Sequence, residues 1–150
     1  MVKNFKINMN HLAALCLLIC TVAGLHAQNV QVTVTGLRSD KGQISVGIFL
    51  DEDSFRAENA SRGFIFHKND IQDGTLTFTL NLEPGLYGLS VLDDVDSDTL
   101  MDYNMLGLPR EGFGFSDYYH SGFSRPKFDS FCFTLEEGET KEITVRMRYL

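Results

Sequence analysis

Five carboxylates fall within the ten residues 93–102, directly after an apolar segment and before a stretch rich in glycine and aromatic residues. Four of these acids, Asp94, Asp96, Asp98 and Asp102, lie an even number of positions apart. Carboxylates crowded in this way repel one another unless a positive charge lies among them. Ca²⁺, which takes about six to eight oxygen ligands, is the cation that such a segment suits best.

The order of the acids matches most of an EF-hand-type calcium loop, in which side chains bind at the first, third, fifth and ninth positions and a backbone carbonyl binds at the seventh. The twelfth position, normally a bidentate glutamate, is Met105 here, so Glu111 or Asp93 is needed to complete the shell. The predicted ligands are Asp94, Asp96, Asp98, Leu100, Asp102 and Glu111. We expect the ion to be structural. A solvated acidic turn without an ion is the alternative that the residues leave open.

Signs of catalysis are sparse. No Gly-x-Ser-x-Gly nucleophile elbow occurs, and neither His67 nor His120 has the spacing of a zinc ligand. Glu111 and the acidic run could form the paired carboxylates of a hydrolase, but that site needs a sugar-sized cleft that a small domain rarely holds. We therefore expect no enzymatic activity, and a small carboxylate-dependent hydrolase is the alternative.

The glycine-rich segment 106–116 has two interpretations. Irregular loops often carry function, so the segment could bind a ligand. The interpretation we favour is a lid folded back on the edge of the domain, with Phe113 and Phe115 buried. Tyr118, Tyr119 and His120 follow directly, and they predict a carbohydrate-binding or partner-binding surface if they are exposed.

The first 27 residues have the pattern of a secretory signal peptide. Lys3 and Lys6 precede an apolar run at residues 12–22, and Ala27 offers a small residue for cleavage. That run is shorter than the roughly 18 residues that cross a bilayer, so we expect no transmembrane segment after cleavage. The prediction is a single domain, residues 28–150, in a secreted, periplasmic or cell-envelope protein.

Removal of the signal peptide changes the charge and the cysteine content. Eleven basic residues then face 20 acidic ones, a net charge of −9, which argues against nucleic acid as a partner. Cys132 is the one cysteine left, so no intrachain disulfide can form. Its phenylalanine neighbours predict a buried and inert thiol. An envelope protein or a carbohydrate remains a possible partner.

Apolar and polar residues alternate through most of the remaining chain, which is typical of strands with one buried face. Residues 51–61 lose this alternation and predict one helical turn, capped by Asp51 or Asp53 with Phe55 inward. The first two strands are expected to form a hairpin. The pattern predicts about seven strands, at residues 30–37, 43–50, 63–67, 75–82, 86–92, 128–135 and 140–149. The expected fold is all-β, an antiparallel sandwich of two sheets.

Five motifs occur in a characteristic order: Pro-Gly-x-Tyr at 84–87, the Asp-x-Asp-x-Asp loop, Leu-Gly-Leu-Pro at 106–109, Glu-Gly-Phe-Gly-Phe-Ser at 111–116 and Pro-x-Phe at 126–128. They resemble the secreted bacterial family catalogued as domain of unknown function 2141, over essentially the whole mature chain. The resemblance implies a secreted or envelope-associated sandwich of immunoglobulin-like or prealbumin-like type and implies no known activity. The family usually has glycine after the third ligand, where this chain has Thr99. A β-branched residue adopts a positive φ poorly, so we expect looser closure or weaker binding.

Together these observations predict a non-enzymatic secreted β-sandwich that serves as a binding or accessory module of the bacterial envelope. The acidic loop is expected to bind Ca²⁺ and to fix the long connection from Asp93 to Gly122. A purely structural domain without any ligand is the third possibility.

Overall fold

The computed structural model describes residues 29–150, and the predicted signal peptide, residues 1–27, lies outside the described residues. The described chain forms eight strands: β1 (Asn29–Thr35), β2 (Gln43–Phe49), β3 (Arg62–His67), β4 (Thr75–Asn81), β5 (Gly85–Asp94), β6 (Gly112–Phe115), β7 (Cys132–Leu135) and β8 (Thr140–Arg146). It also forms the helix α2 (Glu52–Arg56) and the 3₁₀ turns η1 (Lys68–Asp70) and η2 (Phe128–Ser130). Among these residues, no helix has the length and apolar character needed to cross a membrane.

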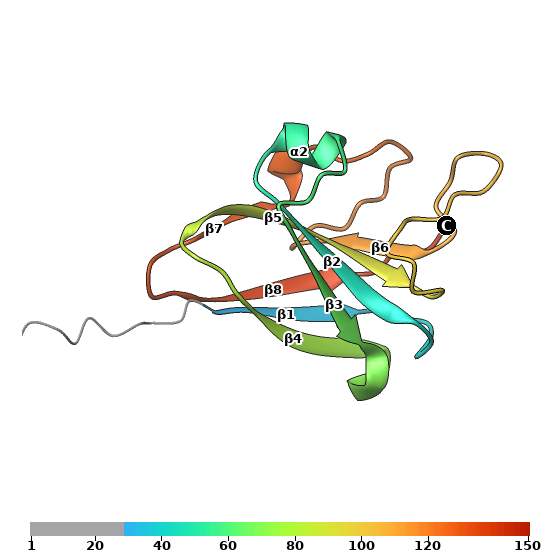
Figure 1. Cartoon of the computed structure of the whole chain (residues 1–150), viewed down its shortest axis with the longest axis horizontal. Helices are drawn as coiled ribbons and strands as arrows, with labels where there is room; N and C mark the ends of the chain where they lie inside the picture. Colours follow the sequence, from blue (N-terminus) through green and yellow to red (C-terminus); the bar gives the residue numbers. More distant parts are fainter. Residues whose placement is uncertain (1–28) are drawn as a thin grey trace, which may run out of the picture.

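The strands form two sheets (Figure 1). One sheet has the order β4-β1-β8, and the other has the order β3-β2-β5-β6, with β7 pairing with the first part of β5. Every pairing between these strands is antiparallel except that of β1 with β8, which is parallel. The predicted all-β, mainly antiparallel two-sheet architecture is confirmed. The finer expectation of an immunoglobulin-like or prealbumin-like type stays a prediction.

The expected hairpin of the first two strands is wrong. Strand β1 pairs with β4 and β8, whereas β2 pairs with β3 and β5 in the other sheet. Both strands bury one face in the same core. Their apolar and polar residues therefore alternate in the same way whether the two strands are neighbours in one sheet or lie in opposite sheets. A short polar connection was therefore mistaken for a hairpin turn.

Two further expectations, for residues 112–115 and for residues 128–130, differ from the structure. Residues 112–115 form strand β6 rather than a lid, although Phe115 is buried as expected and Phe113 is half-buried. Residues 128–130 form η2, so the strand predicted from residue 128 begins at Cys132. The glycines of β6 hid the strand because glycine has low strand propensity. They are required by close packing: an added Cβ would lie 2.4 Å from the Tyr149 ring at Gly112 and 2.5 Å from Val145 Cγ1 at Gly114.

The core lies between the two sheets and is built by the alternation seen in the sequence. Val30, Val32 and Val34 of β1 are fully buried, and they belong to the same cluster as Ile44 and Ile48 of β2. Burial of this kind contributes about 1.5–3 kcal/mol per large aliphatic side chain. The valine-rich β1, central in its sheet, is therefore a main source of cohesion between the layers.

A second, aromatic cluster closes one end of the molecule beneath α2. It consists of the buried residues Phe49, Phe55, Phe115, Phe128 and Phe131. As predicted, Asp51 caps the helical turn, because its Oδ1 accepts a hydrogen bond of 2.7 Å from the backbone N–H of Ser54, and Phe55 points inward. Cys132 packs against this cluster but is only half-buried, so its thiol is less enclosed than expected.

A buried ion pair lies where β5 ends. Lys68 Nζ donates to Asp93 Oδ1, and both side chains are 1% exposed. The Tyr149 hydroxyl donates to the other carboxylate oxygen, and Lys68 also donates to the backbone carbonyl of Lys41. Burial raises the pKa of Tyr149, and the hydrogen bond to Asp93 and the charge of that carboxylate raise it further. The pair ties β5 to η1, to the β1–β2 connection and to the C-terminal segment.

Replacing Lys68 by methionine should lower the free energy of unfolding by about 3–5 kcal/mol, because it leaves the Asp93 charge buried without a counterion. Adding Asp93→Asn in the same chain removes that charge, so the double variant should be more stable than Lys68→Met alone. Urea denaturation of the three proteins measures the difference. Lys141→Met, at the half-exposed pair with Glu139, is the control and should change stability by less than about 1 kcal/mol. Equal losses at Lys68 and Lys141 would contradict the assignment.

Candidate functional site

The acidic run begins on the last two residues of β5, whose side chains point to opposite faces of the sheet. Asp93 faces the ion pair with Lys68, whereas Asp94 faces the other side. Asp93 is therefore already neutralised and belongs to a different environment from the rest of the run. Of the two residues considered for completing a cation shell, this leaves Glu111.

Asp94 is fully buried, and donors surround its carboxylate. Its Oδ2 accepts hydrogen bonds from Gln43 Nε2 (2.7 Å), Ser45 Oγ (3.0 Å) and the backbone N–H of Thr99 (3.0 Å), and its Oδ1 accepts one from the N–H of Asp98 (3.1 Å). Burial alone would raise the pKa of Asp94, but these hydrogen bonds outweigh it and hold the pKa below its ordinary value. Asp94 is thus kept ionised and organises the loop around itself.

Glu111 lies at the other end of the same loop, directly before β6, and is 8% exposed. Its two carboxylate oxygens accept hydrogen bonds from the N–H groups of Val95 (2.9 Å) and Asp102 (3.4 Å). Burial raises the pKa of Glu111, and the charges of Asp94 and Asp96 add to this despite the two hydrogen bonds. A buried carboxylate facing two others is the arrangement that positive charge would relieve.

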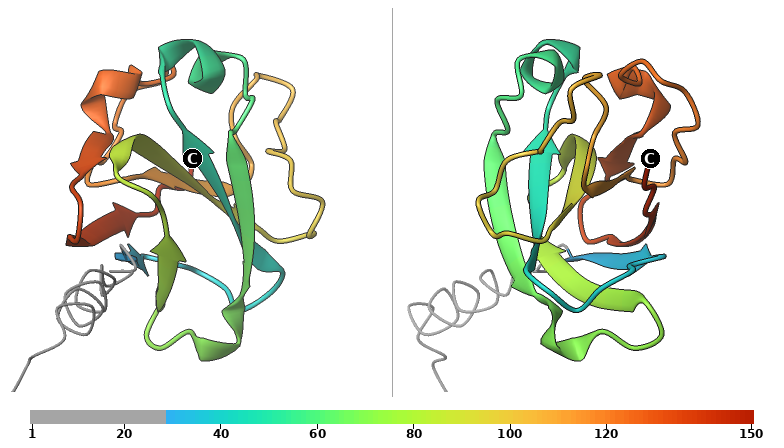
Figure 2. Two further views of the ribbon diagram at one scale, coloured as in Figure 1. Left: turned by 60° about the vertical axis from the view of Figure 1, so that its left-hand side comes forward. Right: turned by 90° about the vertical axis from the view of Figure 1, so that its right-hand side faces the viewer.

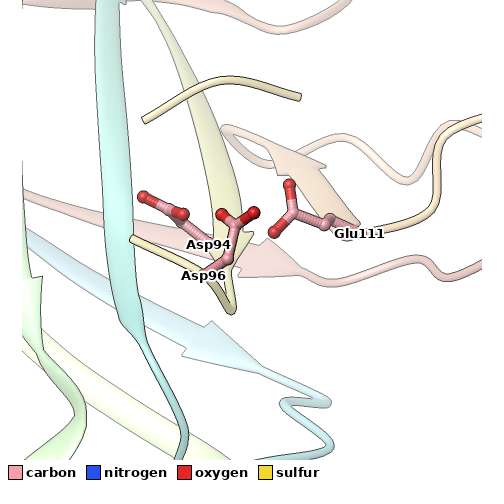
Figure 3. A group of neighbouring side chains, drawn as sticks. All are labelled: Asp94, Asp96 and Glu111. Atoms are coloured by element: carbon pink, nitrogen blue, oxygen red, sulfur yellow. The ribbon is translucent and has the colours of Figure 1, made fainter. Parts of the chain in front are cut away.

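Asp94, Asp96 and Glu111 bring one carboxylate oxygen each to within 4.8 Å of the others. Figure 3 shows the three side chains facing a common space: Asp94 is the last residue of β5, Asp96 lies in the loop after it, and Glu111 directly precedes β6. Calcium binds oxygen at about 2.3–2.6 Å, so two oxygens on one ion lie at most about 5 Å apart. The three oxygens satisfy that limit, and all three are the hard ligands that Ca²⁺ prefers.

The other three predicted ligands lie outside this group. Asp98 Oδ1 accepts a hydrogen bond of 2.7 Å from the N–H of Leu100, whose side chain is 67% exposed. The backbone of Asp102 bonds to Glu111 and to the N–H of Arg110, and its side chain is exposed. Their roles as ligands stay predictions. Gln43 and Ser45, which hold Asp94, were missed because they come from a neighbouring strand more than forty residues away.

The backbone confirms that position 99 requires a positive φ. Thr99 adopts a φ of +67° and Ser97 a φ of +65°, both in the left-handed region. The N–H of Thr99 points to Asp94 Oδ2 in this conformation. A threonine here is strained, because a branched side chain clashes with the backbone at positive φ.

The side chains considered for other chemistry have structural contacts. Ser116 is 1% exposed; its Oγ donates to the carbonyl of Phe131 and accepts from the N–H of Leu89. Among the three aromatic residues predicted as a surface, Tyr119 alone is exposed, and the Arg146 guanidinium lies 3.7 Å from its ring centroid. His120 packs edge-on against Phe115. Tyr118 and His120 are half-buried, so the expected carbohydrate-binding or partner-binding surface has one exposed member, Tyr119, and stays a prediction.

A family model matches residues 32–144: DUF2141, described as an uncharacterized protein conserved in bacteria. The chain belongs to this family. The match spans β1 to β8 and contains the whole acidic loop of this DUF2141 protein. Neither the curated proteins nor the solved structures contain a match to it.

Replacing Thr99 by glycine should stabilise the DUF2141 domain by about 0.5–1 kcal/mol, because glycine adopts φ +67° without a Cβ clash and the gain exceeds its entropic penalty. Chemical denaturation measures the change. The same substitution at Thr77, an exposed residue of β4, is the control and should destabilise. A loss of stability at Thr99 would show that the conformation there is not strained.

The stability of the metal-free domain should fall as pH rises through the range in which Glu111 ionises. The pKa of Glu111 is raised above its ordinary value of 4.5 in the folded state. Between these two pKa values the folded state binds more protons than the unfolded state, so stability decreases with increasing pH. Asp94 has the opposite effect, because its pKa is lowered in the folded state. Its contribution to stability is lost as the pH falls below the ordinary pKa of 3.8.

Denaturation of the wild type and of Glu111→Gln, in a chelator and at a series of pH values above 4.5, isolates the contribution of Glu111. The variant should lack the decline with pH that the wild type shows over this range. Parallel curves would mean that Glu111 titrates normally.

Proposed function

We propose that this DUF2141 protein is a non-enzymatic binding or accessory module of the bacterial envelope, and that its acidic loop binds Ca²⁺ as a structural ion. The observation that carries the proposal is the convergence of Asp94, Asp96 and Glu111. These residues come from the two stems of one long loop, so a single ion between them would hold both stems together.

Two features of the loop favour a structural role for the ion. Asp94 is held by four hydrogen bonds, so part of the site is organised before an ion arrives. Asp96 is exposed, which leaves an open path for a hydrated cation. Burial, and to a lesser extent the charges of Asp94 and Asp96, raise the pKa of Glu111, and an ion here would offset both.

Export and an acidic surface support the envelope assignment. The signal-peptide pattern of residues 1–27 predicts transport out of the cytoplasm. Calcium is more available outside the cell than inside, and extracellular calcium modules bind weakly, with a Kd of about 10⁻⁴–10⁻³ M. The strained Thr99 and the absence of a glutamate at the twelfth position suit an affinity of that order.

Calcium should raise the thermal stability of the purified protein in a saturable manner. Mass action gives about 2.7 kcal/mol at a free calcium concentration of 100 Kd. Magnesium should act more weakly, because it gives up its water reluctantly. Asp96→Asn, which removes one charge at an exposed position, should reduce the calcium-dependent shift in melting temperature while leaving the stability measured in chelator nearly unchanged.

Asp129→Asn is the matched control, because Asp129 is exposed and lies on η2, away from the acidic loop. It should leave the calcium response intact. A melting temperature that is the same in calcium and in chelator, or an equal response from the Asp96 and Asp129 variants, would refute a cation site at Asp94, Asp96 and Glu111.

A further inference from the structure

A groove lies on the outer face of the β3-β2-β5-β6 sheet, on the side opposite the main core. Its floor is set by the strand register, which places Gly63 of β3, Gly47 of β2 and Ser90 of β5 in one row. Gly63 leaves the sheet uncovered at β3, because a Cβ added there would meet nothing within 4 Å, whereas the Phe49 ring lies over Gly47. The neighbouring row, Ile65 and Leu92 on either side of Ser45, is bulkier and borders the floor.

Two loops and the aromatic cluster form the walls of the groove. The β5–β6 loop contributes Met101, Tyr103 and Pro109, and residues 120–126 contribute Phe123 and Arg125. Figure 2 shows the β5–β6 loop, drawn in yellow to orange, lying beside β2 and β3 in both views. The groove is open to solvent and has a volume of about 710 Å³, within the roughly 300–1,000 Å³ typical of small-molecule sites.

The groove exposes apolar surface at several points of its rim. Phe123 is 83% exposed, Ile65 53% and Tyr103 50%, and all three line the same space. Scattered exposed apolar residues are ordinary, but several converging on one concave site mark a binding surface.

Arg125 and Glu58, which line the groove, pair with each other, whereas the buried Nδ1 of His120 in the same lining has no hydrogen-bond partner among the described residues. The Arg125 guanidinium pairs with Glu58 and donates to the carbonyls of Phe55 and Arg56. Ser45 Oγ donates to Asp94. Ser90 Oγ, on the floor, has no hydrogen bond to any residue that the structure describes. With a net charge of −9 after signal removal, the domain also repels anions.

We propose that this groove binds a neutral, largely apolar small molecule that has a flat ring body and one hydroxyl group. The ring lies over Gly63 and against the Phe49 ring that covers Gly47, between aromatic walls that favour stacked or edge-on contacts. The hydroxyl bonds to Ser90 Oγ. Arg125 and Glu58 are already paired with each other, so neither side chain offers a free counter-charge to an acidic or a basic ligand.

Gly63 allows the groove to be filled without disturbing the fold. A Cβ added there meets nothing within 4 Å, and the residue lies on the exposed edge strand β3 without a positive φ. Gly63→Leu therefore occupies the floor. Thr79→Leu adds the same apolar side chain at an exposed position of β4, an edge strand of the other sheet, and serves as the matched control.

The test uses 2-naphthol as the probe and 2-methylnaphthalene as the analogue without a hydroxyl, titrated calorimetrically into the purified protein in calcium-containing buffer. Wild type and Thr79→Leu should bind 2-naphthol with equal affinity, and Gly63→Leu should bind it at least about tenfold more weakly. Ser90→Ala should bind 2-naphthol about 2–10-fold more weakly, which is the contribution of one hydrogen bond. Its affinity for 2-methylnaphthalene should equal that of the wild type.

Circular dichroism and urea denaturation verify that each variant folds, and amide chemical shifts of the wild type locate the probe independently of any substitution. Shifts confined to residues near Gly47, Gly63 and Ser90 support the groove. Absence of saturable binding, unchanged affinity in folded Gly63→Leu, or shifts on the other sheet overturn the proposal. Gly63-dependent binding of a saccharide in place of naphthol overturns the ligand class.

Discussion

Two adjacent carboxylates at the end of β5 impose the constraint on which the functional end of the molecule depends. The pleat of the strand turns Asp93 and Asp94 to opposite faces, and each face neutralises its acid differently. Asp93 receives a lysine cation and a tyrosine hydroxyl, whereas Asp94 receives only neutral donors and keeps its negative charge. One face therefore fixes the fold, and the other retains a net charge that can attract a cation.

The loop between β5 and β6 links the acidic cluster to the groove. Asp94 and Glu111 lie at its two ends, and Tyr103 and Pro109 in between line the groove wall. Ser45 bridges both regions, since its hydroxyl binds Asp94 while its strand forms the groove floor. The position of the wall therefore depends on how closely the two ends of the loop are held.

The alternation of apolar and polar residues was enough to predict most strands. A strand that buries one face, such as β4, has an apolar residue at every second position. Local chemistry predicted a cap at Asp51 or Asp53, and the resemblance to the family, which usually has glycine at position 99, implied the positive φ of Thr99. Strand partners could not be predicted, since the same alternation fits a neighbour in the sheet or a partner across the core. Lys68 as the counterion of Asp93, and Gln43 as a donor to Asp94, depend on that pairing and were hidden for the same reason.

The parallel pairing of β1 with β8 has a consequence for the order of folding. Residues 29–35 form the middle of their sheet, and their second neighbour is residues 140–146, about a hundred positions later. A chain that emerges from its amino end carries the valine-rich β1 with one edge open until its last segment is available. Such a long-range closure is slow. The completed domain is thus reached only after the whole polypeptide has been delivered, and the nascent chain remains in need of protection from aggregation until then.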